Sequence, residues 1–169
     1  MQDRLDALEA RLRALEDIEA IRRLKARYGE LVDARFGDEG LLPEDEVARI
    51  ADRIADLFTV DAVWDGAALG VSRGRAAIRE RFLSSTLTFS WHFFVKPQIE
   101  VDRDVATGRW DIFSPCTAPG NRAYWMTGVE DDRYVRENGV WKHQSMSLRV
   151  VFMSPYDRGW ARRAEETRS

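Results

Sequence analysis

Cysteine and histidine are nearly absent from this chain of 169 residues. Cys116 is the only cysteine, so the chain can form neither an internal disulfide nor a thiolate metal cluster. The two histidines, His92 and His143, do not show the His-x-His or His-Glu-x-x-His spacing of a zinc site. We therefore expect no metal.

Signatures of nucleotide binding and of serine nucleophiles are also missing. The glycine-containing segments DGAALG (65–70) and VSRGRA (71–76) lack the lysine of a P-loop and the spacing of a dinucleotide fingerprint. No serine stands in a nucleophile elbow. These absences predict a protein that uses no cofactor.

Positive charge is not in excess, and no long apolar run occurs. The net charge is −3 and the arginines are scattered among acids, which argues against a nucleic-acid surface. No segment approaches the ~18 consecutive apolar residues of a membrane span, and the first residues, MQDRLDALEARL, contain no apolar signal core. We expect one cytoplasmic domain with neither nucleic acid nor a membrane as partner.

One long helix is predicted over residues 4–35, where apolar residues recur at spacings of three and four. Up to Leu15 the apolar residues form an a/d-like seam with charges elsewhere, which suits packing on another subunit. A solvated helix docked on its own domain is the alternative. We treat residues 1–20 as an extension and a candidate contact in a homo-oligomer, a dimer or trimer.

The second half of this helix carries Tyr28 and Asp33. Five residues apart, they lie about 140° from each other around a helix, so both reach one cavity only if the helix ends there. The sequence Phe36-Gly37-Asp38 is typical of such an ending.

Two more helices and a run of strands follow. The helices are expected over 43–58 and 75–85, with a short strand near 62–64 between them. From Thr88 onward the pattern has period two, which predicts antiparallel strands at 88–95, 97–103, 107–117, 122–136 and 140–153. This order predicts an α+β fold, a cone-shaped barrel in which three N-terminal helices pack on a strongly curved antiparallel sheet, with a pocket inside. We assign the barrel to 21–155 and a tail to 156–169.

Strand alternation places the candidate site residues on the concave face. It puts Ser90, His92 and Phe94 on one face, opposite an apolar set of Phe89, Trp91, Phe93 and Val95. On the third long strand Trp110, Ile112, Ser114 and Cys116 share a face. On the last strand the alternation groups Trp141, His143, Ser145, Ser147, Arg149 and Val151.

The segments LEDIEAIRRLKARYGELVD, GRAAIRERF, HFFVKPQIEV, ATGRW and GVWKHQSMSLRVVF resemble, in this order, the SnoaL-like branch of the nuclear transport factor 2-like superfamily. The spacing is most similar to dehydratases of the bile acid 7α-dehydratase and scytalone dehydratase type. This resemblance implies a Tyr28, Asp33 and His92 site with Arg149 on the last strand. The family's acid beyond the Gly-Arg-Trp turn has no match, because Ser114 stands there.

The residue types agree with acid–base chemistry. A neutral imidazole accepts a proton near physiological pH, a carboxylate orients it, and a phenol donates a hydrogen bond to a departing or developing oxygen. We therefore expect His92 as base, Asp33 as its partner and Tyr28 as the donor. Arg149 would anchor a polar substituent. The remaining candidates for substrate binding are Ser114, Trp110, Trp64, Trp125 and Phe94.

The predicted function is a cofactor-independent lyase of the dehydratase type. Its substrate would be a small, hydrophobic, hydroxylated ring compound that is aromatic, steroid-like or polyketide-like. Alternatives on the same fold are release of formaldehyde from a lignin-derived diaryl diol by C–C cleavage, an isomerase or cyclase, and a non-catalytic ligand-binding module or dioxygenase small subunit.

Overall fold

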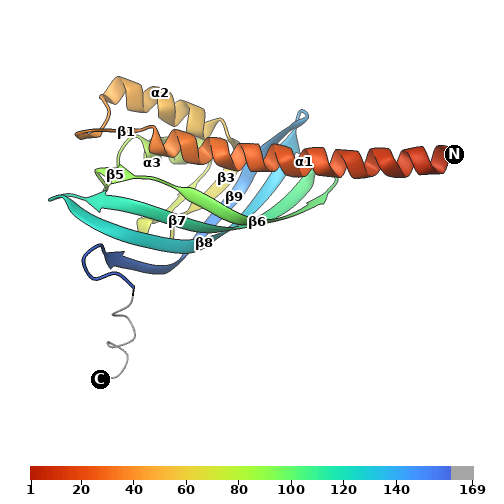
Figure 1. Ribbon diagram of the computed structural model, residues 1–169. Helices are drawn as coiled ribbons and strands as arrows, with labels where there is room; N and C mark the ends of the chain where they lie inside the picture. Colours follow the sequence, from red (N-terminus) through yellow and green to blue (C-terminus); the bar gives the residue numbers. More distant parts are fainter. Residues whose placement is uncertain (161–169) are drawn as a thin grey trace.

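The computed structural model describes residues 1–160, and it has the predicted α+β architecture (Figure 1). Its helices are α1 (Gln2–Asp33), α2 (Glu44–Ala55) and α3 (Arg75–Phe82), with a 3-10 turn, η1, at Ala67–Leu69. A small hairpin joins β1 (Phe36–Gly37) to β2 (Gly40–Leu41). The main sheet contains β3 (Phe58–Asp65), β4 (Val71–Arg73), β5 (Phe89–Ser90), β6 (Phe93–Asp102), β7 (Val105–Ala118), β8 (Arg122–Glu137) and β9 (Val140–Pro155). Within 1–160, no helix is both long and apolar enough to cross a bilayer.

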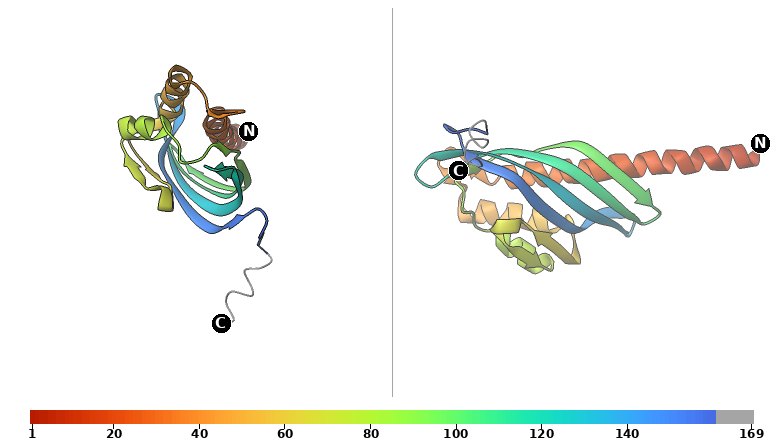
Figure 2. Two further views of the ribbon diagram at one scale, coloured as in Figure 1. Left: turned by 90° about the vertical axis from the view of Figure 1, so that its left-hand side faces the viewer. Right: turned by 90° about the horizontal axis from the view of Figure 1, so that it is seen from below.

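The main sheet curls around the second half of α1, as the end-on view in Figure 2 shows. Its order is β4-β3-β9-β8-β7-β5, and β6 also pairs with β7. All pairings are antiparallel except β3 with β9, so the sheet is mixed rather than purely antiparallel. A parallel pair needs a long connection between its strands, and here the connection from β3 to β9 contains α3 and the strands β4 to β8.

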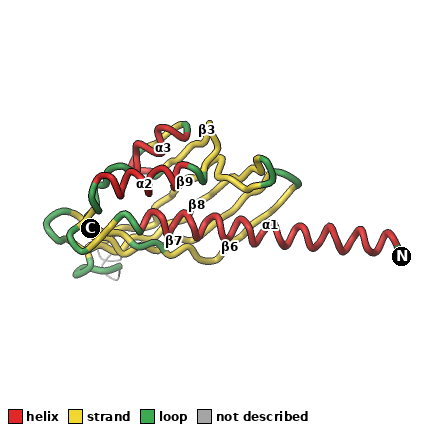
Figure 3. The backbone as a smooth tube through the Cα atoms, turned by 90° about the horizontal axis from the view of Figure 1, so that it is seen from above, coloured by secondary structure: helices red, strands yellow, loops and turns green. Residues whose placement is uncertain are grey.

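The second half of α1 packs inside the cone, and the first half leaves it. Ile21, Tyr28, Leu31 and Val32 are buried, and the helix ends at Asp33, two residues before the predicted end at residue 35. The first half extends well beyond the sheet in the views of Figures 1 and 3. The apolar seam of this half is therefore uncovered in the chain.

The alternation predicted for β5, β6 and β7 is confirmed. Ser90, Phe94 and Ile112 point inward, whereas Trp91 and Phe93 are exposed. The predicted boundary between two strands at residue 96 is wrong, because β6 continues through Pro97 with a register shift between Val95 and Gln98. At a sheet edge such a bulge accommodates a proline, which has no N–H for the ladder.

The face predicted for the second half of β9 is wrong. Tyr134 pairs with His143 but Arg133 pairs with Ser145, so Gln144 is one extra residue in β9. A one-residue bulge turns the side chains that follow it to the other face, here as far as the second register shift, where Gly128 pairs with Val150 and Thr127 with Phe152. Met146 and Leu148 are consequently buried inside the cone, and Arg149 is exposed on the outer face.

Candidate functional site

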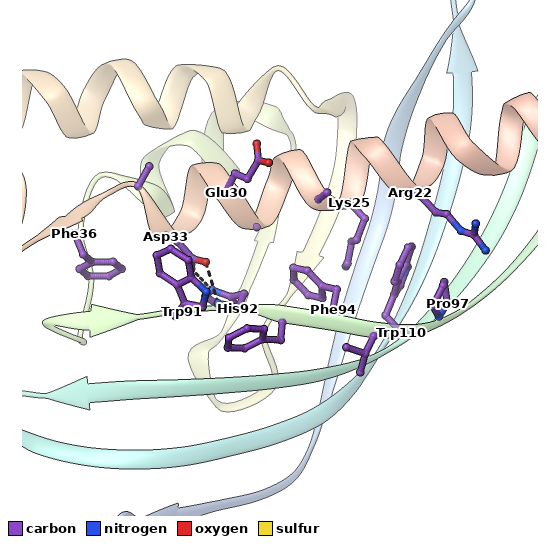
Figure 4. Close-up of a pocket in the computed structure, with 15 residues that line it drawn as sticks. Arg22, Lys25, Glu30, Asp33, Phe36, Trp91, His92, Phe94, Pro97 and Trp110 are labelled. Atoms are coloured by element: carbon purple, nitrogen blue, oxygen red, sulfur yellow. Dashed lines mark hydrogen bonds and ion pairs between the residues drawn. The ribbon is translucent and has the colours of Figure 1, made fainter.

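His92 and Asp33 form the centre of the candidate site (Figure 4). Asp33 is the last residue of α1, and His92 lies in the short link between β5 and β6. The His92 Nδ1 is 2.5 Å from Asp33 Oδ1, and the backbone N–H of His92 donates to Asp33 Oδ2 at 2.9 Å. Both oxygens of one carboxylate are thus fixed by one residue.

This contact sets which nitrogen of His92 is available. An ionised carboxylate only accepts hydrogen bonds, so we assign the proton of the neutral ring to Nδ1. The Nε2 atom then keeps its lone pair and can accept a proton. When it does so, Asp33 stabilises the imidazolium that forms. The pair therefore has the arrangement that an oriented general base requires.

A groove of about 700 Å³ runs between α1 and β6 on one side of the dyad. Its walls are largely apolar and aromatic, as Figure 4 shows. They include His92 and Asp33 together with Trp91, Phe93, Phe94, Trp110, Phe36 and Lys25. The Phe94 ring stacks on His92 with 6.0 Å between ring centroids. An apolar ring compound would fit such walls.

A second space, the inner cavity of about 360 Å³, lies on the other side of His92. Tyr28, Trp64 and His92 line it, together with Arg35, Arg81, Phe82 and the segment 84–87. His92 is thus shared by the groove and the inner cavity. Asp33 bonds to His92 directly, whereas Tyr28 only shares the lining of the inner cavity with it.

Tyr28 is held as a hydrogen-bond donor. Its hydroxyl oxygen accepts a hydrogen bond of 2.9 Å from Trp64 Nε1, and no acceptor for its own proton occurs within residues 1–160. Burial, reinforced by the charge of Glu130, raises the pKa of Tyr28 well above its ordinary value. The phenol stays protonated and can offer its O–H to a ligand in the inner cavity.

Of the six residues predicted to bind substrate, three line the groove or the inner cavity and three do not. Trp64 lines the inner cavity, and Phe94 and Trp110 line the groove. Ser114 is buried on the inner face of β7 away from both linings. Trp125 stacks on Phe113 at 5.5 Å, on the outer side of the sheet, and Arg149 is exposed there. Trp125 pairs with Pro115 and the next residue, Met126, pairs with the inward-facing Ser114, so the side chain of Trp125 lies on the outer face.

Two arginines of the inner cavity were missed by sequence reasoning. Arg35 is 5% exposed and its side chain donates to the carbonyls of Val32, Phe82 and Ser84. Arg81 donates to Ser72 Oγ and to the Leu69 carbonyl. Both stand in helical or turn segments rich in arginine, so nothing in the sequence separates them from surface arginines.

A buried ionic cluster deeper in the cone was also missed. Lys25 is fully buried and pairs with Glu130 and, at 2.7 Å, with Asp132 Oδ2. The Tyr134 hydroxyl donates to the same Asp132 oxygen at 2.7 Å, and Trp110 Nε1 donates to Tyr134 at 3.0 Å. Burial disfavours the charged amine, but Asp132 and Glu130 outweigh it and raise the pKa of Lys25. The cluster links α1 to β7 and β8.

His143 packs beside this cluster as a neutral ring. It stacks on Phe58 with 5.0 Å between centroids, and its two ring nitrogens find no hydrogen-bond partner among residues 1–160. Burial, together with the charge of Lys25, lowers its pKa well below the ordinary value. It is a structural histidine and does not reach the dyad's cavities.

Replacing Asp132 by asparagine is expected to weaken the pH dependence of stability between about pH 4 and pH 6. Burial raises the pKa of Asp132 from 3.8 to about 6, although Lys25 lowers it. A carboxyl with a raised folded-state pKa holds its proton more tightly when folded, so its contribution to the unfolding free energy declines as pH rises through this range. The decline is at most ~3 kcal/mol. Urea unfolding of both proteins at several pH values measures it, and parallel profiles would contradict it.

No group of three or more histidine, cysteine, aspartate or glutamate side chains in the described part of the chain could hold a metal ion. The expectation that the protein uses no cofactor stays a prediction.

A model of the SnoaL-like domain matches residues 45–147, which is more than half of the chain. The chain belongs to the SnoaL-like family. The matched segment lies within the barrel predicted over 21–155. A search of curated proteins finds no match.

Solved structures with the same fold resemble this SnoaL-like protein over most of its length. A nuclear transport factor 2-like protein with a cystatin-like fold from Novosphingobium aromaticivorans is 25% identical, with a TM-score of 0.70 and coverage of 98% of this chain and 97% of that one. A protein from the same organism that is proposed to be a scytalone dehydratase is 20% identical (TM-score 0.69, coverage 84% and 89%). A hexachlorocyclohexane dehydrochlorinase, LinA type 2, is 22% identical (TM-score 0.68, coverage 89% and 91%). These likenesses confirm the predicted nuclear transport factor 2-like fold.

Proposed function

We propose that this SnoaL-like protein is a cofactor-independent lyase that eliminates water from a hydrophobic, hydroxylated ring compound. The observation that carries the proposal is the His92–Asp33 contact at 2.5 Å, placed between an aromatic groove and a cavity that contains a phenol donor. A structural subunit does not need such a group. Dehydration and dehydrochlorination, the reactions in the names of two similar proteins, are both eliminations.

The chemistry follows from the positions of three side chains. His92 Nε2 removes a proton from carbon, the C–H electrons form the new double bond, and the C–O bond on the neighbouring carbon breaks. The proton taken by His92 passes to the departing hydroxide, which leaves as water. Because the pKa of Tyr28 is raised, Tyr28 stabilises the departing oxygen by a hydrogen bond and keeps its own proton.

A substrate screen by ultraviolet absorbance tests the proposal directly. Elimination lengthens conjugation, so hydroxylated aromatics, diaryl diols and hydroxysteroids would each reveal turnover as a new absorbance band. We expect the wild type to convert at least one class and His92→Ala to lose at least ~100-fold in rate, because a general base contributes about that much or more. Arg79→Gln, an exposed change on α3, serves as the control.

The products would also separate the alternatives. Release of formaldehyde would indicate C–C cleavage, and a product of unchanged mass would indicate an isomerase. If no compound reacts and ligands bind equally to wild type and His92→Ala, the lyase proposal fails and a binding module remains.

Replacing Tyr28 by phenylalanine is expected to lower kcat by about 10- to 100-fold with a smaller change in KM, since it removes one donor to the developing charge. The ring packing against Phe58 and Phe82 is kept. Steady-state kinetics on the substrate found by the screen measures the effect. Trp64→Phe removes the neighbouring N–H but leaves the phenol, so a larger loss in that variant would contradict the role given to Tyr28.

A further inference from the structure

Charge is distributed unevenly around the inner cavity. Its lining holds two arginines, Arg35 and Arg81, and no aspartate or glutamate. Among residues 1–160, neither arginine forms an ion pair with a carboxylate. Buried charges in proteins are usually paired, so the buried cation of Arg35, with the partly exposed Arg81 in the same lining, favours an anionic ligand.

Arg35 is the deeper of the two cations. Burial lowers its pKa from 12.5 to about 10, partly offset by the nearby charge of Asp33, so it remains charged at neutral pH. Its Nε donates to the Val32 carbonyl at 3.1 Å and its Nη1 to the Phe82 carbonyl at 3.1 Å. The Nη2 group has no partner in the described residues. Carbonyl dipoles orient this guanidinium but do not neutralise it.

Arg81, on α3, is held in a similar way. Its Nε donates to Ser72 Oγ at 3.0 Å and its Nη2 to the Leu69 carbonyl at 2.6 Å, while its Nη1 is unpartnered among the described residues. The guanidinium carbon lies 4.7 Å from the centre of the Trp64 ring. Trp64 therefore fixes this cation beside an apolar wall.

We propose that the inner cavity binds the planar oxyanion of an aromatic ligand, such as a ring carboxylate or phenolate. The guanidinium groups would hold the oxyanion, because their N–H groups match its oxygens in number and geometry. Trp64 and Phe82 would contact the attached ring. The inference rests on the proposed function, since it assigns to the substrate of the dyad an anionic ring substituent. Arg149, which is on the outer face, has no part in it.

Calorimetric titration with naphthalene-2-carboxylate and its neutral amide tests the assignment without any turnover. The wild type should bind the carboxylate at least ~10-fold more tightly than the amide, and Arg81→Gln should remove that preference while leaving the affinity for the amide unchanged. Arg81→Lys should retain part of the preference through its charge. Arg79→Gln is the matched control, because Arg79 lies on the same helix, is exposed and pairs with Asp52.

Several outcomes would overturn the proposal. Equal affinity of the wild type for both compounds would do so, as would no binding of the carboxylate at millimolar concentration or an equal effect of the Arg79 control. Arg81 is chosen over Arg35 because Arg35 ties α1 to the carbonyls of Phe82 and Ser84 and its loss would unfold the site. A protein that eliminates water through His92 but shows no preference for the carboxylate would refute only the anion site. A protein that binds the carboxylate through Arg81 but converts nothing would refute only the lyase.

A second, independent inference concerns the first half of α1. Leu5, Leu8, Leu12 and Leu15 are each between 49% and 65% exposed. By helix geometry they point roughly 160° away from the buried side formed by Ile21, Tyr28 and Val32. A partner lying along this seam would therefore not collide with the barrel.

The charges beside the seam specify which partner fits. With Leu5 and Leu12 at a positions and Leu8 and Leu15 at d positions, the g positions hold Arg4 and Arg11 and the e positions hold Glu9 and Glu16. In a parallel pair of identical helices, each g residue faces the e residue of the following heptad, so every contact joins arginine to glutamate. An antiparallel pair would join arginine to arginine and glutamate to glutamate.

We propose that α1 pairs in parallel with α1 of a second copy of this chain. The next a and d positions are Glu19 and Arg22, so the apolar contact covers about two heptads and ends where the helix enters its own domain. Two heptads are too short for a stable free helix, but here the helix continues from the folded domain, which removes the cost of nucleation. We expect a weak, concentration-dependent dimer.

Sedimentation equilibrium of the full 169-residue chain tests the pairing. The wild type should gain mass with concentration toward twice its monomer mass, and Leu8→Glu/Leu12→Glu should stay monomeric. Ala7→Glu/Ala10→Glu, which changes exposed positions outside the seam, is the control. Glu9→Arg/Glu16→Arg should also dissociate the dimer. In the parallel pair, this change replaces each attraction between arginine at g and glutamate at e by a repulsion between two arginines. A monomeric wild type at ~100 μM, or self-association that survives the leucine or the charge changes, would overturn the proposal.

Discussion

Asp33→Asn, His92→Ala and the double variant are expected to lose activity to a similar extent, at least about 100-fold in kcat, rather than additively. The reason is that both side chains act as one base in the proposed mechanism. The Asp33 carboxylate holds the proton of His92 on Nδ1 through a contact of 2.5 Å. An asparagine can present its NH2 group to Nδ1, which moves the ring proton to Nε2 and removes the lone pair that accepts the substrate proton.

Steady-state rates of the four proteins on one substrate measure this coupling. The double variant should be no slower than His92→Ala by more than about twofold, because the orienting group has nothing left to orient. The free energy of unfolding should be measured alongside, since Asp33 also accepts the backbone N–H of His92. If Asp33→Asn lost only stability and kept its rate, Asp33 would be a structural contact and His92 an independent base.

Lys25→Met is expected to lower the free energy of unfolding by about 3–5 kcal/mol at pH 7, the largest stability effect we anticipate from one substitution outside the dyad. Lys25 is fully buried and is the shared cation of Glu130 and Asp132. Its removal leaves two carboxylates close together in the cone without a counter-charge. Urea unfolding at pH 7 gives the value directly.

The same variant should be less damaged in acid. Burial raises the pKa of Asp132 to about 6, so once this carboxyl is protonated the missing cation leaves less buried charge, and the difference from wild type should shrink as the pH falls below about 6. Lys25→Met combined with Glu130→Gln and Asp132→Asn should recover much of the loss, because a buried cluster can be replaced by neutral groups at little net cost. Equal losses in the single and triple variants would show that packing of the lysine stem, not its charge, is what matters.

The sequence pattern predicts the helices, whereas it does not by itself predict the contact between Asp33 and His92. Hydrophobic periodicity predicts α1 to α3 because each helix buries one face against the sheet. The dyad depends on α1 ending at Asp33, two residues before the predicted end of the helix at residue 35. The pairing of Asp33 with His92, 59 residues away, was expected only from the resemblance to the family.

The missed features depend on contacts that no local pattern contains. Lys25 occupies a charged position of a charged helix, and Glu130 and Asp132 stand in the acidic string VEDD, so each reads as a solvated residue. Only the closure of the cone brings them together. The bulge at Gln144 is likewise invisible, because the residues around it alternate as regularly as those of an unbroken strand.

The extra residue Gln144 determines which side chains of β9 face into the cone. A chain that lost Gln144 would keep the length of its barrel almost unchanged, yet Ser145, Ser147 and Arg149 would turn into the cone and Met146 and Leu148 out of it. A single codon deletion would thus exchange an apolar cone wall for a polar, cationic one without altering any of the side chains involved. Insertions and deletions in β9, as much as substitutions, are therefore a route by which this scaffold can acquire a new substrate.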